Sequence, residues 1–291
     1  MNESTPLEKI VKLVPLLSRA KILSAEVLPG GLSNLNYLVT ADEERFVVRI
    51  AGKNSVILGI DRVREAAAIR LAQDAGIAPE VVAFFLPDGH SVTRYLATAH
   101  PLTTNEFSSK KMIEKVATRL REIHALEPIE GDFNPYADIR RWLKIVKQRK
   151  IHYPERLAAV LARIDKIEHF RRQRDDVKRV LCHNDPYFKN FLYDGSLWVI
   201  DWEYAGMGDP LYDLAGVAYA LDKYGRDHLL ASYFGHNSQG LHTELNDLIT
   251  VFLCWNIVWS LVQHDSSEID HDYLECNEKL LDLVPQQHQD I

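Results

Sequence analysis

The stretch VLCHNDPYFKNFL, residues 180–192, places three polar side chains between two short apolar runs. They are His183, Asp185 and Asn190, which can accept a proton, donate hydrogen bonds or bind a metal. Strand side chains alternate with a period of two, so these three cannot share one face of a strand. The spacing therefore predicts a loop between two short strands, a usual place for catalytic residues. The alternative is an ordinary turn, because Asp and Asn also favour turns.

Two more acids follow at the end of an apolar strand pattern. In LWVIDWEYAG, Asp201 and Glu203 are two residues apart and therefore lie on one face of the strand. Burying two carboxylates without a counter-charge is unfavourable, so a bound cation is the simplest resolution. Magnesium fits, since it takes oxygen ligands and needs only one or two carboxylates. The alternative is a strand end that emerges into water with both acids solvated.

The order of loop, hairpin, apolar strand and acid is the layout of kinases. In that layout the loop Asp takes the proton of the attacking hydroxyl, while the loop Asn and the strand-end Asp hold magnesium on the ATP phosphates. The protein-kinase signature has Arg where this chain has Asn184, and Phe-Gly where it has Trp202-Glu203. With HNDPYFKN, VIDWEYAGMGDPLYDLA and GGLSNLNYLV, the chain resembles the choline/ethanolamine kinase family of the aminoglycoside phosphotransferase superfamily, from about residue 25 to about residue 275.

This resemblance implies a fold, a reaction and a set of roles. The fold is α+β and protein-kinase-like, with a small antiparallel-sheet lobe over residues 1–95 and a larger, mainly helical lobe over residues 96–291. The cofactors are ATP and Mg²⁺, and the acceptor is a small amino alcohol, with choline or ethanolamine first. The implied roles are catalysis by Asp185, metal binding by Asn190 and Asp201, and support of the loop by His183 and Asp213. Residues implied at the nucleotide are Ser33, Asn34, Arg49, Glu65 and Tyr95, and those at the acceptor are Glu203, Asp209, Trp255, Trp259 and Tyr273.

The nucleotide side also has features that the residues themselves indicate. In FVVRIA, Arg49 lies on the opposite strand face from Phe46, Val48 and Ile50, and a basic residue in so apolar a strand calls for an anion. The alternative is that the apolar stem of the Arg49 side chain packs on the protein while its guanidinium reaches water. The GGLSN segment brings glycines and small polar side chains between two strands, where the backbone can approach phosphate. A plain Gly-Gly hairpin is the alternative.

The acceptor side is specified less well. In CWNIVWSLVQ, Trp255 and Trp259 are four residues apart and share a helix face, and Tyr273 follows. Aromatic faces attract a quaternary ammonium. Aromatics at helical spacing can equally be core, and we expect packing from Trp255 and a binding role from Trp259. Choline kinases commonly carry a Glu where this chain has Ala220.

Patterns along the chain agree with a sheet-rich part followed by a helical part. Strand-like pieces dominate before residue 95, and the clearest helix is predicted in SSKKMIEKVATRLREIHAL. Its apolar residues recur at helical spacing: Met112, Ile113, Val116, Leu120 and Ile123. Gly76 is expected to end the Ala-rich helix before it. The apolar run VFLCWNIVWSLV is expected to be too short to span a bilayer.

Composition limits the partners. The formal net charge of −7 and the pI of about 5.9 argue against a general nucleic-acid or anionic-membrane surface. Three scattered cysteines with no C-x-x-C pair indicate a reducing cytoplasm. Three alternative functions remain: a kinase of another hydroxylated amine such as an aminoglycoside or thiamine, a catalytically silent nucleotide-binding protein, and a metal-dependent hydrolase. The oligomeric state is not indicated.

Overall fold

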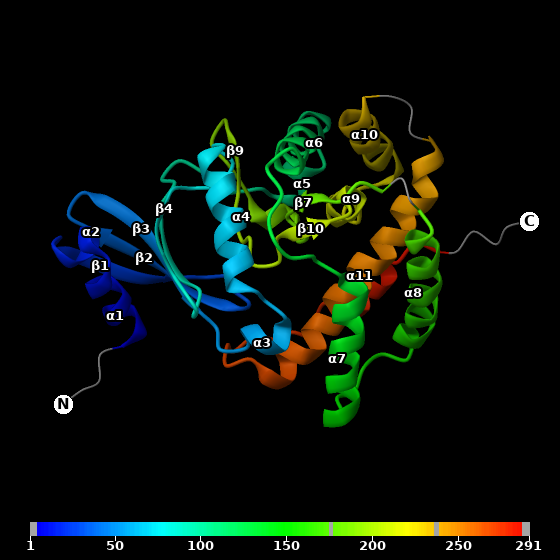
Figure 1. Cartoon of the computed structure of the whole chain (residues 1–291), viewed down its shortest axis with the longest axis horizontal. Coiled ribbons are helices and arrows are strands. Elements are labelled where there is room, and N and C mark those ends of the chain that lie inside the picture. Colours follow the sequence, from blue (N-terminus) through cyan, green and yellow to red (C-terminus); the bar gives the residue numbers. More distant parts are fainter. Residues whose placement is uncertain (1–4, 175–176, 236–238, 287–291) are drawn as a thin grey trace, which may run out of the picture.

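A twisted antiparallel sheet forms one end of the molecule (Figure 1). This computed structural model describes residues 5–174, 177–235 and 239–286. The strand order is β1-β2-β3-β5-β4, with every neighbouring pair antiparallel. The strands are β1 (Ile22–Leu28), β2 (Asn34–Ala41), β3 (Glu44–Ala51), β4 (Val81–Phe85) and β5 (His90–Arg94). The predicted strand faces are confirmed in β3, where Phe46 and Val48 are fully buried and Arg49 points to the other side.

Two short helices cover the buried face of this sheet. They are α1 (Pro6–Leu13) and α2 (Pro15–Ser18), and α1 begins with a capping box in which Thr5 and Glu8 bond reciprocally. Ile10, Val14 and Leu17 pack with the inward residues of β2, β3 and β5 into a small separate core.

Two helices between β3 and β4 connect the sheet to the rest of the chain (Figure 1). They are α3 (Ser55–Leu58) and α4 (Arg62–Asp74), and Asp61 caps α4 by accepting from two backbone N–H groups. Gly76 has φ +68° just after α4, which confirms it as the stop. Buried residues of both helices belong to the core of the helical part, so the division near residue 95 stays a proposal.

The helical part surrounds one large core. Its helices are α5 (Thr104–Phe107), α6 (Lys110–His124), α7 (Pro135–Arg149), α8 (Arg156–Arg172), α9 (Pro210–Ala218), α10 (Lys223–Phe234), α11 (His242–Ser266) and α12 (Asn277–Asp282), with 3₁₀ turns η1 (Phe188–Asn190) and η2 (Gln239–Leu241). The stripe predicted on α6 is buried throughout. The long α11 contacts α7, α8, α9 and α12.

Helix α11 is longer than the apolar run that predicts it. Its 25 residues are long and apolar enough to cross a membrane by length and composition, whereas the expectation concerned only the shorter run within it. The helix is instead a core helix, because 78% of its most apolar window is buried inside the molecule.

Short strand pairs carry the polar loop between the helices. The strands are β6 (His100–Pro101), β7 (Val180–Cys182), β8 (Phe191–Tyr193), β9 (Leu197–Val199) and β10 (Gly206–Gly208). β7 pairs with β10, and β6, β8 and β9 form a small sheet. The strands predicted before and after the polar loop, and the hairpin to the acid pair, are therefore present.

Candidate active site

The polar loop from β7 to β8 is held by a buried carboxylate. Asp213, on the first turn of α9, accepts from the backbone N of His183 at 2.8 Å and of Asn184 at 2.6 Å. Asn184 has φ +66°, a left-handed conformation that Asn tolerates better than most residues. His124 of α6 adds a third bond to Asp213, at 3.0 Å. These contacts are those expected of a support, and the sequence analysis had not included His124.

The His183 side chain joins the loop to the strand-end acid segment. Its Nδ1 accepts from the backbone N of Asp185 at 3.3 Å, so its Nε2 donates to the carbonyl of Ile200 at 3.0 Å. Burial lowers the pKa of His183, which keeps the ring neutral at pH 7. Both nitrogens are therefore engaged, and His183 has the contacts of a positioning residue rather than those of a base.

Asp185 and Asn190 face each other across the loop. Asn190 Nδ2 donates to the backbone carbonyl of Asp185 at 2.9 Å and to its Oδ2 at 3.2 Å. Burial raises the pKa of Asp185 well above its ordinary value, and the charges of Asp201 and Glu203 raise it further. A carboxyl group held in this way is a candidate general base whose basicity exceeds that of a free Asp.

Asp201 lies in the turn after β9 with φ +67°. Burial, then the neighbouring charge of Glu203, raises the pKa of Asp201 to about 7. Burial is the largest cause of both raised pKa values, and neighbouring carboxylates raise them further, while Arg49 and Arg62 act in the opposite direction on Asp201. Oxygen donors with surplus negative charge fit a hard divalent cation such as Mg²⁺.

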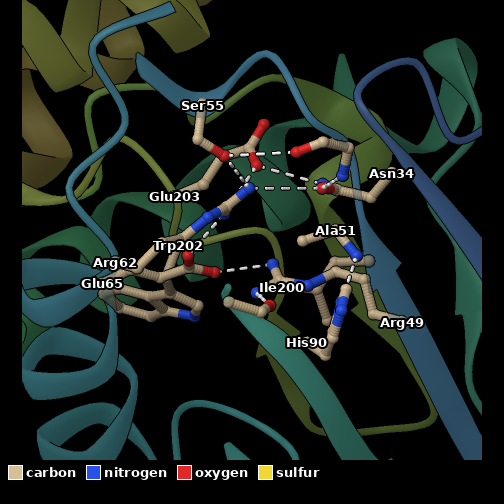
Figure 2. Close-up of polar contacts among 12 residues, drawn as sticks. Asn34, Arg49, Ala51, Ser55, Arg62, Glu65, His90, Ile200, Trp202 and Glu203 are labelled. Carbon is tan, nitrogen blue, oxygen red and sulfur yellow. Dashed lines mark hydrogen bonds and ion pairs between the residues drawn. The ribbon is translucent and has the colours of Figure 1, made fainter. Parts of the chain in front are cut away.

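Arg49, which was expected at the nucleotide, is held by two partners. Its NH1 pairs with Glu65 Oε1 at 2.6 Å, as expected from the resemblance, and its NH2 donates to the carbonyl of Gly89 at 2.8 Å. Figure 2 shows Arg49 reaching from its strand toward Glu65 of α4. The guanidinium is thus anchored among protein groups and does not extend into water.

Arg62 is a second buried cation that the sequence analysis missed. Its NH1 contacts Glu65 Oε2 at 2.6 Å and Glu203 Oε2 at 3.2 Å, and its NH2 donates to Ser55 Oγ at 2.9 Å (Figure 2). The signal was available, because Arg62 precedes Glu65 by three residues on a helix start, where such pairs interact. Arg62 therefore joins α4 to the turn that carries Glu203.

Glu203 was expected at the acceptor, and the structure instead places it against Arg62 and against Asn34, which was expected at the nucleotide. Besides Arg62, its Oε2 accepts from Asn34 Nδ2 at 3.0 Å, and its side chain is only 3% exposed. Asn34 Oδ1 in turn accepts from Gly52 N at 3.2 Å. Asn34 thus connects the Gly-rich segment, the end of β3 and the acid pair.

The Gly-rich loop between β1 and β2 is tightly folded. Gly30 has φ +96°, and a Cβ on Gly31 would lie 2.2 Å from the carbonyl oxygen of Asn34. Only glycine fits there, so the loop is specified more strictly than an ordinary hairpin. Ser33 lies half-buried at its end. Tyr95 follows β5, and the guanidinium of Arg45 covers its ring at 4.7 Å.

Trp259 and Tyr273 come together as expected. Their ring centroids are 6.0 Å apart in an edge-to-face arrangement, and Trp259 Nε1 donates to the hydroxyl of Tyr204 at 2.8 Å. Tyr204 follows Glu203 directly and was missed, although its place beside the acid pair was a signal. These three aromatic side chains form a contacting cluster, in which Tyr204 and Tyr273 are buried and Trp259 is half-buried, and we call it the aromatic wall.

Trp255 and Asp209 are held by protein groups. The ring of Trp255 lies beneath the aromatic wall, edge-to-face with Tyr204 at 4.7 Å between centroids. Trp255 is 2% exposed and packs against Trp142 at 5.0 Å, which favours the packing role over binding. Asp209 caps α9 through the backbone N of Leu211 at 2.9 Å and forms an ion pair with Arg171. Its charge is already paired, so its contacts are structural.

The chain is similar to known proteins over most of its length. The sequence profile described as "Phosphotransferase enzyme family" matches residues 24–245. Protein LicA of Haemophilus influenzae is 27% identical over 273 residues, 87% of this chain and 100% of that protein. The probable ethanolamine kinase A of Dictyostelium discoideum is 25% identical over 305 residues, 91% of this chain and 85% of that protein. The crystal structure of choline kinase LicA from Streptococcus pneumoniae matches with a TM-score of 0.81 and 25% identity, over 96% of this chain and 99% of that one.

Proposed function

We propose a reaction for this chain, which belongs to the phosphotransferase enzyme family and is a kinase. It transfers the terminal phosphoryl group of ATP to the hydroxyl of a small amino alcohol, with choline and ethanolamine as the first candidates. One observation carries the proposal: Asp213 and His183 hold a loop that presents Asp185 and Asn190 beside the buried acid Asp201. The named activities of the relatives support the substrate class.

In the proposed mechanism, Asp185 accepts the proton of the acceptor hydroxyl as that oxygen attacks phosphorus. The bond from Asn190 Nδ2 to Asp185 Oδ2, at 3.2 Å, orients the carboxylate for this task. Asn190 and Asp201 would hold magnesium, which when bound supplies positive charge to the phosphate oxygens. Arg49, anchored by Glu65, faces the phosphates from the sheet, and the Gly-rich loop approaches them with its backbone.

The aromatic wall is proposed to receive the cationic end of the acceptor, because ring faces attract ammonium groups. We also propose that the protein acts in the cytoplasm. Cys182, Cys254 and Cys276 are all free thiols, as a reducing compartment favours.

A panel of acceptors tests the function. Purified protein with magnesium and ATP is incubated with choline, ethanolamine, an aminoglycoside or thiamine, and ADP is measured against a no-acceptor control. We expect ADP above background with choline or ethanolamine, and a rate lower by about 10² or more with the Asp185→Asn variant. Turnover only with thiamine or the aminoglycoside would reassign the substrate. Phosphate release that is independent of any acceptor would identify a hydrolase.

A further inference from the structure

One carbonyl of the Gly-rich loop is held by the far end of the chain. The oxygen of Leu32 accepts from Tyr273 Oη at 2.8 Å and from Gln263 Nε2 at 3.1 Å. Both donors lie on the C-terminal side of the acid pair, more than two hundred residues away in sequence. We call these two bonds the loop tether.

The donors of the loop tether have defined orientations. Ser267 Oγ lies 2.7 Å from the hydroxyl of Tyr273, and because the single proton of that hydroxyl goes to Leu32, Ser267 is the donor to it. Gln263 is 1% exposed, and since Leu32 offers only an oxygen, the amide nitrogen must face it. The tether is therefore a buried and directional contact.

A neighbouring contact joins the same two regions. Asn54, which follows β3, donates to the carbonyl of Ser266 at 2.6 Å. Figure 1 shows the end of α11 approaching α3 at this place. The last turn of α11 thus holds both the Gly-rich loop and the connection after β3.

The tether is continuous with the aromatic wall. Tyr273 presents its ring to Trp259 and its hydroxyl to Leu32. Gln263 lies one helical turn after Trp259 on α11, so the two side chains share a face of that helix. A molecule that packs against Trp259 and Tyr273 therefore restrains the side chain that holds the loop.

We propose that Tyr273 and Gln263 couple acceptor binding to nucleotide binding, by holding the phosphate-facing loop through Leu32. The coupling rests on the proposed function, because it needs an acceptor at the aromatic wall. The acceptor packs against Tyr273 and so stabilises the tethered position of the loop, the position that the nucleotide binds, and each ligand therefore strengthens the other. Tyr273 and Gln263 are positioning residues in this scheme.

Calorimetry with a non-hydrolysable ATP analogue and magnesium tests the coupling, in the absence and presence of saturating choline and of saturating ethanolamine. In the wild type we expect the amine that is turned over to tighten analogue binding about five-fold or more, with the reciprocal effect of equal size. Tyr273→Phe keeps the ring against Trp259 and removes only the hydroxyl. It is expected to reduce the coupling factor by about two-fold or more toward one, which is within the scale of one hydrogen bond.

Gln263→Met removes the other donor of the loop tether at similar side-chain volume. It is the second test variant and replaces Tyr273→Phe if that variant folds poorly. The control is Tyr153→Phe, which removes a hydroxyl from a half-buried tyrosine between α7 and α8 and should leave the coupling at the wild-type value. A purely structural role would weaken analogue binding equally with and without amine. If the wild type turns over one of the amines but the coupling factor is unchanged in both variants, the proposed coupling is wrong and the proposed function stands. If the acceptor panel gives no turnover with either amine, the proposed function falls, and the coupling falls with it.

Discussion

Two aspartates of the site illustrate how position changes chemistry at the scale of single residues. Asp185 is hydrogen-bonded by Asn190, whereas Asp201 lies in a left-handed turn close to Arg49 and Glu203. Burial raises the pKa of both, so each resists ionisation without a cation nearby. Their different surroundings support different proposed roles, which substitution can separate.

Asp185→Asn is expected to lower turnover by about 10² to 10⁴, the usual scale for loss of a general base, while nucleotide affinity stays nearly unchanged. The reason is that the amide keeps the shape of the loop but cannot accept the proton. Turnover and analogue binding are measured on the same preparation. Because the base must be ionised, the wild-type rate should fall as the pH falls through the pKa of Asp185. Wild-type turnover from the variant would contradict this role, and His183 would then need the same test.

Asp201→Asn is expected to stabilise the metal-free protein at pH 8. An acid whose pKa is about 7 when folded and near 3.8 when unfolded holds its proton better in the folded state. Stability is therefore lost as the pH rises from about 4 to about 7, and the penalty is complete above that range. We expect the variant to gain about 1 to 3 kcal/mol at pH 8 and less at pH 5, measured by urea unfolding with a chelator. A variant that is less stable than the wild type at pH 8 would refute the raised pKa.

At the scale of elements, the network around α4 joins three segments that are distant in sequence. Arg62 contacts Glu65 on its own helix, Glu203 in the turn after β9, and Ser55 at the start of α3. Asn34 reaches the same Glu203 oxygen from β2. A buried network of charges is weak evidence for net stability. Removing one partner, however, leaves the other charges buried without a counter-charge.

Arg62→Met should therefore destabilise the protein by about 3 to 5 kcal/mol, because two carboxylates lose a buried cation. Arg64→Met is the matched control two residues later on α4. Within the part of the chain that the structure describes, Arg64 NH1 donates to the carbonyl of Asp132 alone, at 2.7 Å, and that loss should cost about 1 kcal/mol. Both are measured by chemical unfolding. Combining Arg62→Met with Glu203→Gln should cost less than the sum, because the two side chains interact. An equal loss from the two Arg variants would mean that the carboxylates do not depend on Arg62.

Elements with a regular period were predictable, whereas contacts across the chain were not. The stripe of α6, the stop at Gly76 and the strands around the polar loop follow from local patterns, and all are present. The Arg49–Glu65 pair came only from the family resemblance. Arg62, His124 and Tyr204 were missed, because their partners Glu203, Asp213 and Trp259 lie 141, 89 and 55 residues away. Periodicity identifies a face but not what packs on it.

At the scale of the whole molecule, α11 connects the core to both proposed ligand sites. Trp255 packs in the core, Trp259 contributes to the aromatic wall, and Gln263 reaches the Gly-rich loop through Leu32. Each step is one helical turn. Substitutions along this helix should therefore change from affecting stability to affecting acceptor binding over a single turn.

Trp255 and Trp259 provide the test of that change. Trp259→Leu should lose about 0.5 to 2 kcal/mol of acceptor affinity, whereas Trp259→Phe should keep most of it, because a ring face remains for the cation. Trp255→Leu should cost about 1 to 3 kcal/mol of stability, since it leaves space beside Trp142 and removes the bond from Trp255 Nε1 to Asp138 at 3.3 Å. Acceptor affinity is measured as the Michaelis constant for the acceptor at saturating ATP. This constant does not depend on the fraction of the protein that is active. The reverse result, with Trp255 controlling acceptor affinity and Trp259 only stability, would move the acceptor site to the other tryptophan. If neither variant changed the acceptor constant, the amine would have to bind away from the aromatic wall.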